Sequence, residues 1–333
     1  MKKYLLPEKG NFYKANLHCH STLSDGRITP EDLKEAYKAE GYSVIAYTDH
    51  NILVSHNHLS DDTFLALNGV EMDCEEPREG LPPRANRACH IGFIALSPDN
   101  LIYPCYHRTK FMDGNDHLRH LIQYDDTLPD FEHIYSPECI SAMMQEGREK
   151  GFFVTYNHPT WSGERKEDYC NYHGMHAMEI MNYDCMYGGY DDYNEKEYDE
   201  MLRAGERIFC TGTDDNHGFA DRFGAYTVIK AEKLEYTAIT DALVKGNFYA
   251  SMGPEIYALW FEDGKIHIEC SDVRQIRINT AVHRAKCLWR DQEPLTSATF
   301  DVLPEDQYVR ITLVDQKGYH ANTNAYFTDE LFK

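Results

Sequence analysis

Short runs of apolar residues alternate with amphipathic segments along the first three quarters of the chain. The run 43–47 is apolar throughout rather than alternating, which is typical of a strand buried on both faces. Segment 29–41 carries helix signals, with Thr29 as the cap, Pro30 at the first helical position and Gly41 as the stop. The same signals predict strands at 12–17, 43–47, 63–67, 91–96, 152–156, 177–181, 207–211 and 225–229, and helices at 29–41, 136–151, 195–204 and 236–245.

This alternation of strands and helices predicts an α/β barrel whose site lies at the C-terminal ends of its strands. The segment from about 98 to 135 is polar and aromatic without a clear period, so we expect a long excursion that lines or covers a site. After Gly253-Pro254 the pattern changes to short strands separated by turn residues, with no good helix after about 247. We therefore expect a domain boundary near 252, with the barrel over 1–252 and a small β-sandwich of unknown role over 253–333.

The net charge of the chain excludes some classes of binding partner. The 333 residues carry a formal net charge of −22. Nucleic-acid polymers and anionic membranes bind basic surfaces, so neither is expected as a partner. No apolar run has the length of a signal-peptide core or of a membrane span. The 10 cysteines form no CxxC pairs, which favours reduced thiols and a cytoplasmic protein.

The first predicted strand ends in Asn16-Leu17-His18-Cys19-His20-Ser21. Side chains alternate along a strand, so His18 and His20 share one side, about 7 Å apart, and can converge on one metal ion. Alone, the pair could equally be unrelated polar residues of a loop. Further nitrogen and oxygen donors follow at later strand ends, and the full set is His18, His20, Asp25, His50, Glu71, His90, His158, Asp215 and His217. Imidazole and carboxylate ligands without thiolate predict a polynuclear centre of manganese, iron or zinc.

The order of these motifs resembles the motif series of the PHP (polymerase and histidinol phosphatase) family. The resemblance covers about residues 16–217 and rests on His18-x-His20, Ser24-Asp25-Gly26, Thr48-Asp49-His50-Asn51, Glu71, His90, Asn157-His158-Pro159 and Asp215-x-His217. It implies a distorted (β/α)7 TIM-like barrel and a phosphoesterase site with two or three metals. The trailing β domain resembles a PHP-like branch that includes hydrolases of carbamate esters and amides as well as predicted phosphoesterases.

The resemblance also implies an assignment of ligands. The first metal would be bound by His18, His20, Glu71 and Asp215. Glu71 would bridge to a second metal held by His90 and His158. A third metal would be bound by Asp25, His50 and His217, where the family often has histidine in place of Asp25. Asp49 and Asp214 would then orient ligands.

The chemistry expected of such a centre is hydrolysis. A metal-bound water loses its proton near neutral pH and attacks as a metal-bound hydroxide, and no protein nucleophile is required. If the third metal is absent, His217 or His50 could protonate the leaving oxygen. A His217→Asn variant should then lose more activity than metal, whereas equal loss of both would favour a ligand role.

Candidates for substrate binding are less distinctive. Arg84, Arg87 and Arg222 lie in loops that could reach the site, and a guanidinium suits bidentate binding of phosphate. The simpler interpretation of each is an ordinary surface arginine. Asn182 ends a predicted strand and could touch the substrate or simply cap a turn. Trp161 could stack on a ring or serve packing alone.

The sequence thus predicts a metal-dependent phosphoesterase that hydrolyses a small phosphorylated metabolite or nucleotide. An alternative keeps the metals but cleaves a carboxylic or carbamate ester or an amide. Cationic side chains that converge on the open metal face would favour phosphate, and their absence would favour the neutral ester. Two further alternatives are a catalytically dead binding module, which nine retained donors oppose, and a proofreading nuclease, which the acidic charge opposes.

Overall fold

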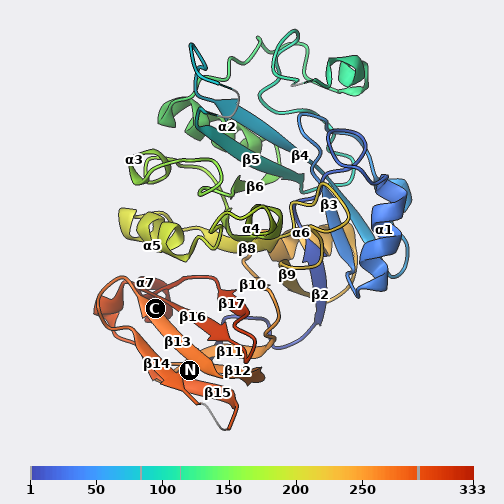
Figure 1. Cartoon of the computed structure of the whole chain (residues 1–333). Coiled ribbons are helices and arrows are strands. Elements are labelled where there is room, and N and C mark those ends of the chain that lie inside the picture. Colours follow the sequence, from blue (N-terminus) through green and yellow to red (C-terminus); the bar gives the residue numbers. More distant parts are fainter. Residues whose placement is uncertain (1, 83–84, 113, 291–292) are drawn as a thin grey trace.

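The computed structural model describes residues 2–82, 85–112, 114–290 and 293–333, and it forms one large and one small sheet flanked by helices (Figure 1). The helices are α1 Pro30–Ala39, α2 Pro137–Glu149, α3 Lys166–Tyr169, α4 Tyr183–Tyr187, α5 Glu195–Ala204, α6 Tyr236–Val244 and α7 Thr328–Leu331, with 3-10 turns at Asn57–Leu59, Asp116–Leu121 and Pro304–Asp306. The strands before the predicted boundary are β1 Lys3–Tyr4, β2 Asn11–Asn16, β3 Val44–Tyr47, β4 Leu65–Glu75, β5 Ala88–Ala95, β6 Phe152–Asn157, β7 Ala177–Asn182, β8 Phe209–Thr213, β9 Tyr226–Ala231 and β10 Phe248–Ser251. Those after it are β11 Ile256–Glu262, β12 Lys265–Val273, β13 Gln275–Thr280, β14 Lys286–Trp289, β15 Leu295–Asp301, β16 Tyr308–Val314, β17 His320–Thr323 and β18 Tyr326–Phe327.

The predicted helices form where their caps place them. Thr29 and Ser136 accept hydrogen bonds from the backbone N–H groups of Asp32 and Cys139, and a proline follows each cap. Each helix buries one apolar face, such as Leu33 and Tyr37 in α1. The predicted helices 29–41, 136–151, 195–204 and 236–245 are therefore confirmed, as α1, α2, α5 and α6.

The large sheet mixes strand directions. β2, β3 and β4 are parallel to one another, and so are β6, β7 and β8. β5 pairs antiparallel with both β4 and β6, so the two parallel groups run in the same direction. β9 pairs antiparallel with β2. The predicted alternation of strands and helices is interrupted at β5, because β5 follows β4 along the chain and pairs with it antiparallel.

β8 and β9 lie side by side although they share no ladder. Thr227 Oγ1 on β9 accepts from the backbone N–H of Gly212 at 3.2 Å and donates to its carbonyl at 2.9 Å. Glycine suits this position because a Cβ there would lie 2.9 Å from the carbonyl oxygen of Tyr226. β9 and β8, the two ends of the row of strands that runs from β9 through β2 to β8, therefore lie next to each other at this point.

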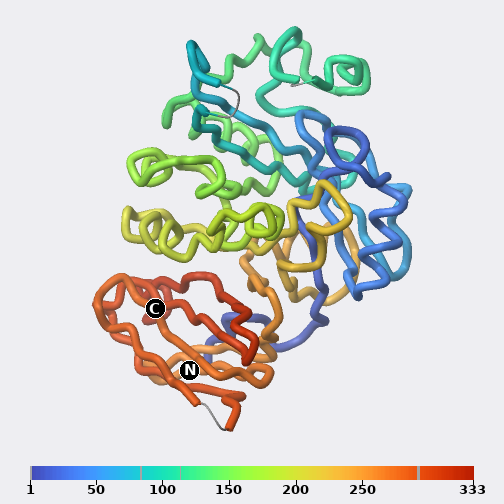
Figure 2. Tube along the Cα trace, in the orientation of Figure 1, coloured from blue at the N-terminus to red at the C-terminus, as the bar shows by residue number. Residues whose placement is uncertain are grey.

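The C-terminal strands form two layers around a shared apolar core. β1, β11, β12 and β15 make the small sheet, and β13, β14, β16 and β17 continue the large one. Ile268 of β12 and Ile311 of β16 belong to the same buried cluster. Both ends of the chain lie in this part of the molecule (Figures 1 and 2), and Leu5 and Leu6 pack into its core.

The domain boundary near 252 stays a prediction. The ladder between β10 and β17 runs across it, with Ser251 opposite Ala321. The expectation of no helix beyond 247 is wrong for one short segment, α7. Among the described helices, none combines the length and the apolar character that a membrane span requires.

Candidate metal centre

The predicted ligands come together at one edge of the large sheet. They follow the ends of β2, β3, β6 and β8, or lie within β4, and they include His18, His20, His50, Glu71, His158, Asp215 and His217. His90 differs, because it lies near the start of β5, opposite Asp73 and Asn157. Since β5 runs antiparallel to its neighbours, its start reaches the same edge as their ends.

The two histidines after β2 converge as their alternation predicts. Asp215 donates its backbone N–H to the carbonyl of His18 at 3.0 Å, and His20 donates to the carbonyl of Asn216 at 3.1 Å. These bonds hold the segment extended after β2, with Cys19 buried on the opposite side. The Nε2 atoms of His18 and His20 lie 3.0 Å apart.

Two carboxylates lie against these histidines. His18 Nε2 is 3.1 Å from Glu71 Oε1 and 3.0 Å from Asp215 Oδ1. His20 Nε2 is also 3.0 Å from Asp215 Oδ1. This arrangement brings together the four residues assigned to a first metal by resemblance.

Glu71 also faces the other histidines of the site. Its Oε2 lies 3.3 Å from Nδ1 of His90, and its Oε1 lies 3.3 Å from Nε2 of His158. Glu71 thus stands between two groups of imidazoles, where a bridging carboxylate was expected. His50 is nearer this group than expected, because its Nδ1 lies 3.3 Å from Glu71 Oε2.

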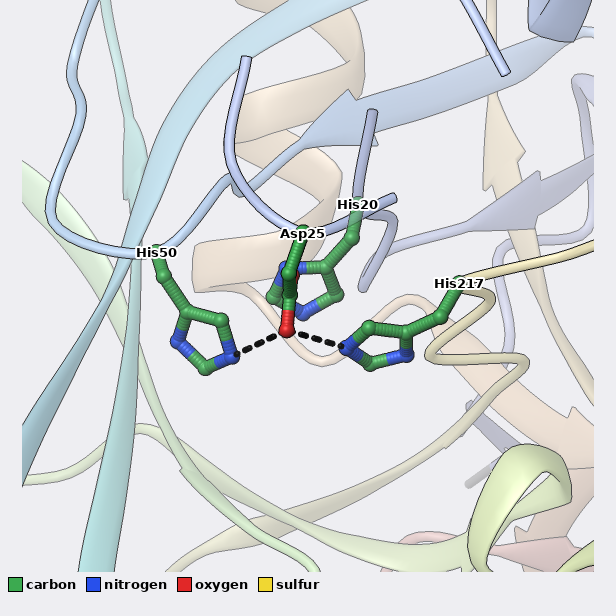
Figure 3. Close-up of side chains that lie close together, drawn as sticks. All are labelled: His20, Asp25, His50 and His217. Carbon is green, nitrogen blue, oxygen red and sulfur yellow. Dashed lines mark ion pairs between the residues drawn. The ribbon is translucent and has the colours of Figure 1, made fainter. Parts of the chain in front are cut away.

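A third group surrounds Asp25, the most exposed of the predicted ligands (Figure 3). Asp25 Oδ2 lies 3.5 Å from Nε2 of His217 and 3.8 Å from Nε2 of His50. His20 reaches the same carboxylate through its Nδ1, 3.6 Å from Oδ1. All nine predicted ligands therefore lie in one continuous cluster, and His20 and His50 each lie close to two of the groups.

The donors in this cluster fit divalent cations. Four of its buried atoms, His20 Nδ1, Glu71 Oε2, His90 Nδ1 and Asp215 Oδ1, make no hydrogen bond of acceptable geometry with the described residues, although each lies within 3.6 Å of another donor of the cluster. A buried polar atom without a partner costs about 1–3 kcal/mol, so their grouping here needs a ligand to explain it. A cation bound by imidazole nitrogen and carboxylate oxygen would satisfy them.

The electrostatics of the cluster favour positive charge. Burial acts to lower the pKa of His20 and His158, yet the carboxylates of Asp215 and Glu71 raise the two values to about 10 and about 9. Burial acts to raise the pKa of Glu71, but the adjacent histidines lower it well below its usual range. The pKa of His50 falls to about 3, because it is buried and faces His20.

The backbone takes rare conformations where it carries these ligands. Asn51, His158 and Asp215 have φ values of +56°, +27° and +53°. Residues other than glycine seldom adopt such φ values, and backbone strain of this kind is concentrated at functional sites.

Asp49 and Asp214, expected to orient ligands, contact the loops that carry them. Asp49 accepts from the backbone N–H of Ser21 at 2.7 Å and from the hydroxyl of Ser24 at 2.7 Å, so it shapes the turn between His20 and Asp25. Asp214 accepts from the Tyr37 hydroxyl at 2.8 Å and from the backbone N–H groups of residues 223–225.

The arginines proposed for substrate binding are less well placed for that role than the predicted metal ligands are for theirs. Arg84 lies outside the described residues. Arg87 is bound by two carboxylates, with Nη2 at 2.8 Å from Glu76 and Nη1 at 2.6 Å from Asp168. The guanidinium of Arg222 lies over the rings of Phe219 and Phe223.

Asn182 serves as a cap and a link between buried groups. Its Oδ1 accepts from the backbone N–H of Cys185 at 3.0 Å, which caps α4. Its Nδ2 donates to Glu179 at 2.9 Å and to Asp215 at 3.0 Å. Asn182 therefore contacts a predicted ligand, and its amide is committed to protein partners.

A cavity of about 760 Å³ opens over the cluster. Trp161 forms one wall and packs edge-on against His90 and His158, with ring centroids 5.2 and 4.9 Å away. The excursion reaches the cavity through Asn115, as expected, and Asn115 donates to the carbonyl of His50 at 2.8 Å. The other described residues of the wall include Asp73, Glu75, Arg78, Asn86, Asp184 and Tyr190.

Two residues of the site escaped the sequence analysis. Glu179 lies within β7, buried, and contacts His18. The sequence does contain a signal for it, because Glu179 is a lone carboxylate inside the apolar strand Ala177-Met178-Glu179-Ile180-Met181. Asp184 lies on the cavity wall with Oδ2 at 3.7 Å from His217 Nδ1, and burial raises its pKa to about 7.

No model of a known protein family matches the sequence, and neither does any curated protein. Two of the solved structures similar to this chain are described as metal-dependent phosphoesterases, one of them as PHP-like. A two-domain protein from Bacteroides vulgatus, described as containing a predicted PHP-like metal-dependent phosphoesterase, is 14% identical, with a TM-score of 0.45 over 97% of this chain and 98% of that one. A protein from Bifidobacterium adolescentis with a provisional description as a metal-dependent phosphoesterase is 14% identical, with a TM-score of 0.39 over 63% of this chain and 90% of that one. An amidohydrolase from Chromobacterium violaceum, with bound sulfate and no metal, is 15% identical, with a TM-score of 0.37 over 62% and 88%.

Proposed function

We propose that this protein is a metal-dependent hydrolase whose centre binds two or three divalent cations, manganese, zinc or iron. The observation that carries the proposal is the cluster of nine nitrogen and oxygen donors in which four buried atoms have no hydrogen-bond partner among the described residues. The cluster lies at the floor of a cavity large enough for a small-molecule substrate.

When bound, divalent cations supply a coordinated water of low pKa and polarise the bond to be cleaved. The chain's own residues would hold these cations and orient the side chains around them. Glu71 stands between two groups of histidines and would be shared by two cations. His217 donates its Nδ1–H to the carbonyl of Asp215 at 2.8 Å, which turns Nε2 toward Asp25 and the open side of the site. From there His217 could hand a proton to a leaving oxygen if the third position is empty, whereas His50 beside it, with a pKa of about 3, holds no such proton near neutral pH.

The motif series supports a phosphate ester of a small metabolite or nucleotide as the first candidate substrate. A second candidate, a carboxylic or carbamate ester or an amide, is supported by the cavity wall. Arg78 is the one arginine or lysine among the described wall residues, and Glu75 binds it with Nη2–Oε distances of 2.7 Å. The carboxylate of Asp73 faces the same cavity and opposes a phosphate dianion.

We also infer that the strands from β9 through β2 to β8 form the distorted barrel expected from the motif series, and that the C-terminal layers form a β-sandwich. The bonds between Thr227 and Gly212 support closure of the barrel, and the shared apolar core supports the sandwich. All ten cysteines are free thiols, which supports a reducing compartment such as the cytoplasm.

The test is turnover of p-nitrophenyl phosphate beside p-nitrophenyl acetate after loading with manganese or zinc. Release of phosphate that is lost in a His18→Ala variant would support the phosphoesterase. Cleavage of p-nitrophenyl acetate alone would favour the second candidate, a hydrolase of esters or amides. Neither activity in protein that has bound metal would contradict both.

A further inference from the structure

Glu179 joins three segments that carry predicted metal ligands. It lies in the middle of β7 with 1% of its surface exposed. Its Oε1 accepts from His18 Nδ1 at 2.7 Å and from the hydroxyl of Thr213 at 2.7 Å. Its Oε2 accepts from the backbone N–H of His158 at 3.0 Å and from Asn182 Nδ2 at 2.9 Å. Four donors therefore converge on one buried carboxylate.

This carboxylate decides which nitrogen of His18 carries a proton. An ionised carboxylate only accepts hydrogen bonds, so the Nδ1 atom of His18 must be the donor. The neutral imidazole then keeps its lone pair on Nε2. That atom faces the centre, 3.1 Å from Glu71 and 3.0 Å from Asp215. A histidine that ligates a metal needs its metal-facing nitrogen unprotonated in this way.

A carboxamide cannot replace this carboxylate without cost. The backbone N–H of His158 can only donate, and the amide of Asn182 is oriented by the bond that its Oδ1 accepts from Cys185. A glutamine oxygen must therefore take the place of Oε2, which puts the NH₂ group at the place of Oε1. The Thr213 hydroxyl can turn and accept, but His18 can accept only with an unprotonated Nδ1, which moves its proton to Nε2.

We infer that Glu179 is a positioning residue that fixes the tautomer of His18 and anchors the backbone of His158, and that it thereby sets the affinity of the centre for its cations. The inference rests on the proposed function, because it assumes that His18 Nε2 ligates a metal. Glu179 touches neither the cavity nor a substrate, so it acts entirely through these two histidines.

The first measurement is zinc affinity, by competition with a chromophoric chelator. A Glu179→Gln variant should bind its tightest zinc about 10- to 100-fold more weakly than the wild type, the usual effect of losing such a partner. The matched control is Thr213→Val, which removes another donor to the same Oε1 and leaves the carboxylate in place. It should stay within about twofold of the wild type, and equal affinity of wild type and Glu179→Gln would overturn the inference.

The second measurement reads the proton directly. Protein labelled with ¹⁵N-histidine, with and without zinc, should show a proton on His18 Nδ1 in the wild type and in Thr213→Val, and no such proton in Glu179→Gln. A purely structural role for Glu179 would leave this signal unchanged, and its persistence in Glu179→Gln would overturn the inference. Glu179→Asp keeps the acceptor, so it should retain the proton and recover part of the affinity. This variant also serves if Glu179→Gln fails to fold.

The outcomes separate this inference from the proposed function. If the wild type binds neither zinc, manganese nor iron, the proposed function fails. If the wild type binds zinc and Glu179→Gln binds it equally well, only the role of Glu179 fails.

Discussion

Histidines of this protein that are buried or half-buried differ in their neighbours, and the neighbours decide in which direction the pKa of each histidine moves. Those of the metal centre face carboxylates, which raise the pKa of His20 and His158. His176 has no such neighbour among its described contacts. Its Nδ1 accepts from the backbone N–H of Val154 at 3.0 Å, and its ring stacks on Phe153 with centroids 5.0 Å apart. Burial and then Arg148 lower the pKa of His176 to about 4.

This pKa gives a prediction for stability against pH. An unfolded histidine has a pKa near 6.5, so between pH 6.5 and 4 the unfolded chain binds more protons at this position than the folded one. The contribution of neutral His176 is therefore complete above pH 6.5 and is lost as the pH falls toward 4. Between these values the wild type should lose about 2 kcal/mol more of its unfolding free energy than His176→Asn, whose amide oxygen can accept the same bond without titrating.

Urea unfolding of both proteins at pH 7.0 and pH 4.5 measures this difference. The other acid-sensitive groups are common to the two proteins and cancel. Parallel losses in the wild type and in His176→Asn would contradict the assigned role of His176.

At the scale of elements, the antiparallel strand β5 interrupts the regular alternation of parallel strands and helices. β5 lies between β4 and β6, and α2 packs over it from outside. The contact is close at Gly147 of α2, where an added Cβ would lie 2.3 Å from Cε1 of Phe93 and 3.1 Å from Cγ2 of Val154. Phe93 is fully buried, so its ring can move aside only within a closely packed core.

A Gly147→Ala substitution should therefore destabilise the protein although alanine favours helix by about 1 kcal/mol. We expect a net loss of about 1–3 kcal/mol, the usual cost of overpacking a core. The control is Gln145→Ala on the exposed side of the same helix, which should change stability by less than about 0.5 kcal/mol. Chemical denaturation checks both, and a Gly147→Ala protein as stable as the wild type would show that α2 can shift away from β5.

The elements themselves were largely predictable, whereas their directions were not. Caps such as Thr29 and Ser136 mark helix starts in the sequence, and both work as caps in the structure. The direction of β5 has no such signal, because a buried strand reads as an apolar run whether it is parallel or antiparallel. Most candidate ligands could be found because they follow strand ends. Glu179 lies inside a strand, where a carboxylate shows its role only once His18 and His158 are seen beside it.

At the scale of the whole molecule, the C-terminal layers are tied to the rest of the protein by buried charge. Arg310 of β16 is fully buried and binds Asp199 of α5 through Nε and Nη2, each at 2.8 Å. Its Nη2 also lies 2.9 Å from Glu195, which starts α5. The loop before α5 holds Asp192, which accepts from the backbone N–H of Trp161 at 2.8 Å. The C-terminal layers thus support the helix whose preceding loop shapes the cavity wall.

Removal of Arg310 should lower the stability of the protein, because it takes away two hydrogen bonds from the partly buried carboxylate of Asp199 and one of the two arginines that bind Glu195. We expect Arg310→Leu to lower the unfolding free energy by about 3 kcal/mol, at the lower end for a broken buried pair since Arg277 still binds Glu195 at 2.6 Å. Lys196→Ala, an exposed change on the same helix, is the control and should have little effect. A loss below about 1 kcal/mol in urea unfolding of Arg310→Leu would show that this contact does not stabilise the attachment.

The central claim for the molecule is that its cluster of histidines and carboxylates is a metal centre. The most direct measurement is the metal content per chain after reloading and desalting, by elemental analysis, in the wild type, in Glu71→Ala and in the exposed control Asp241→Ala. We predict two or three equivalents of divalent metal in the wild type and the control, and the loss of at least one equivalent in Glu71→Ala, because Glu71 faces both groups of histidines. No stoichiometric metal in the wild type would contradict the claim.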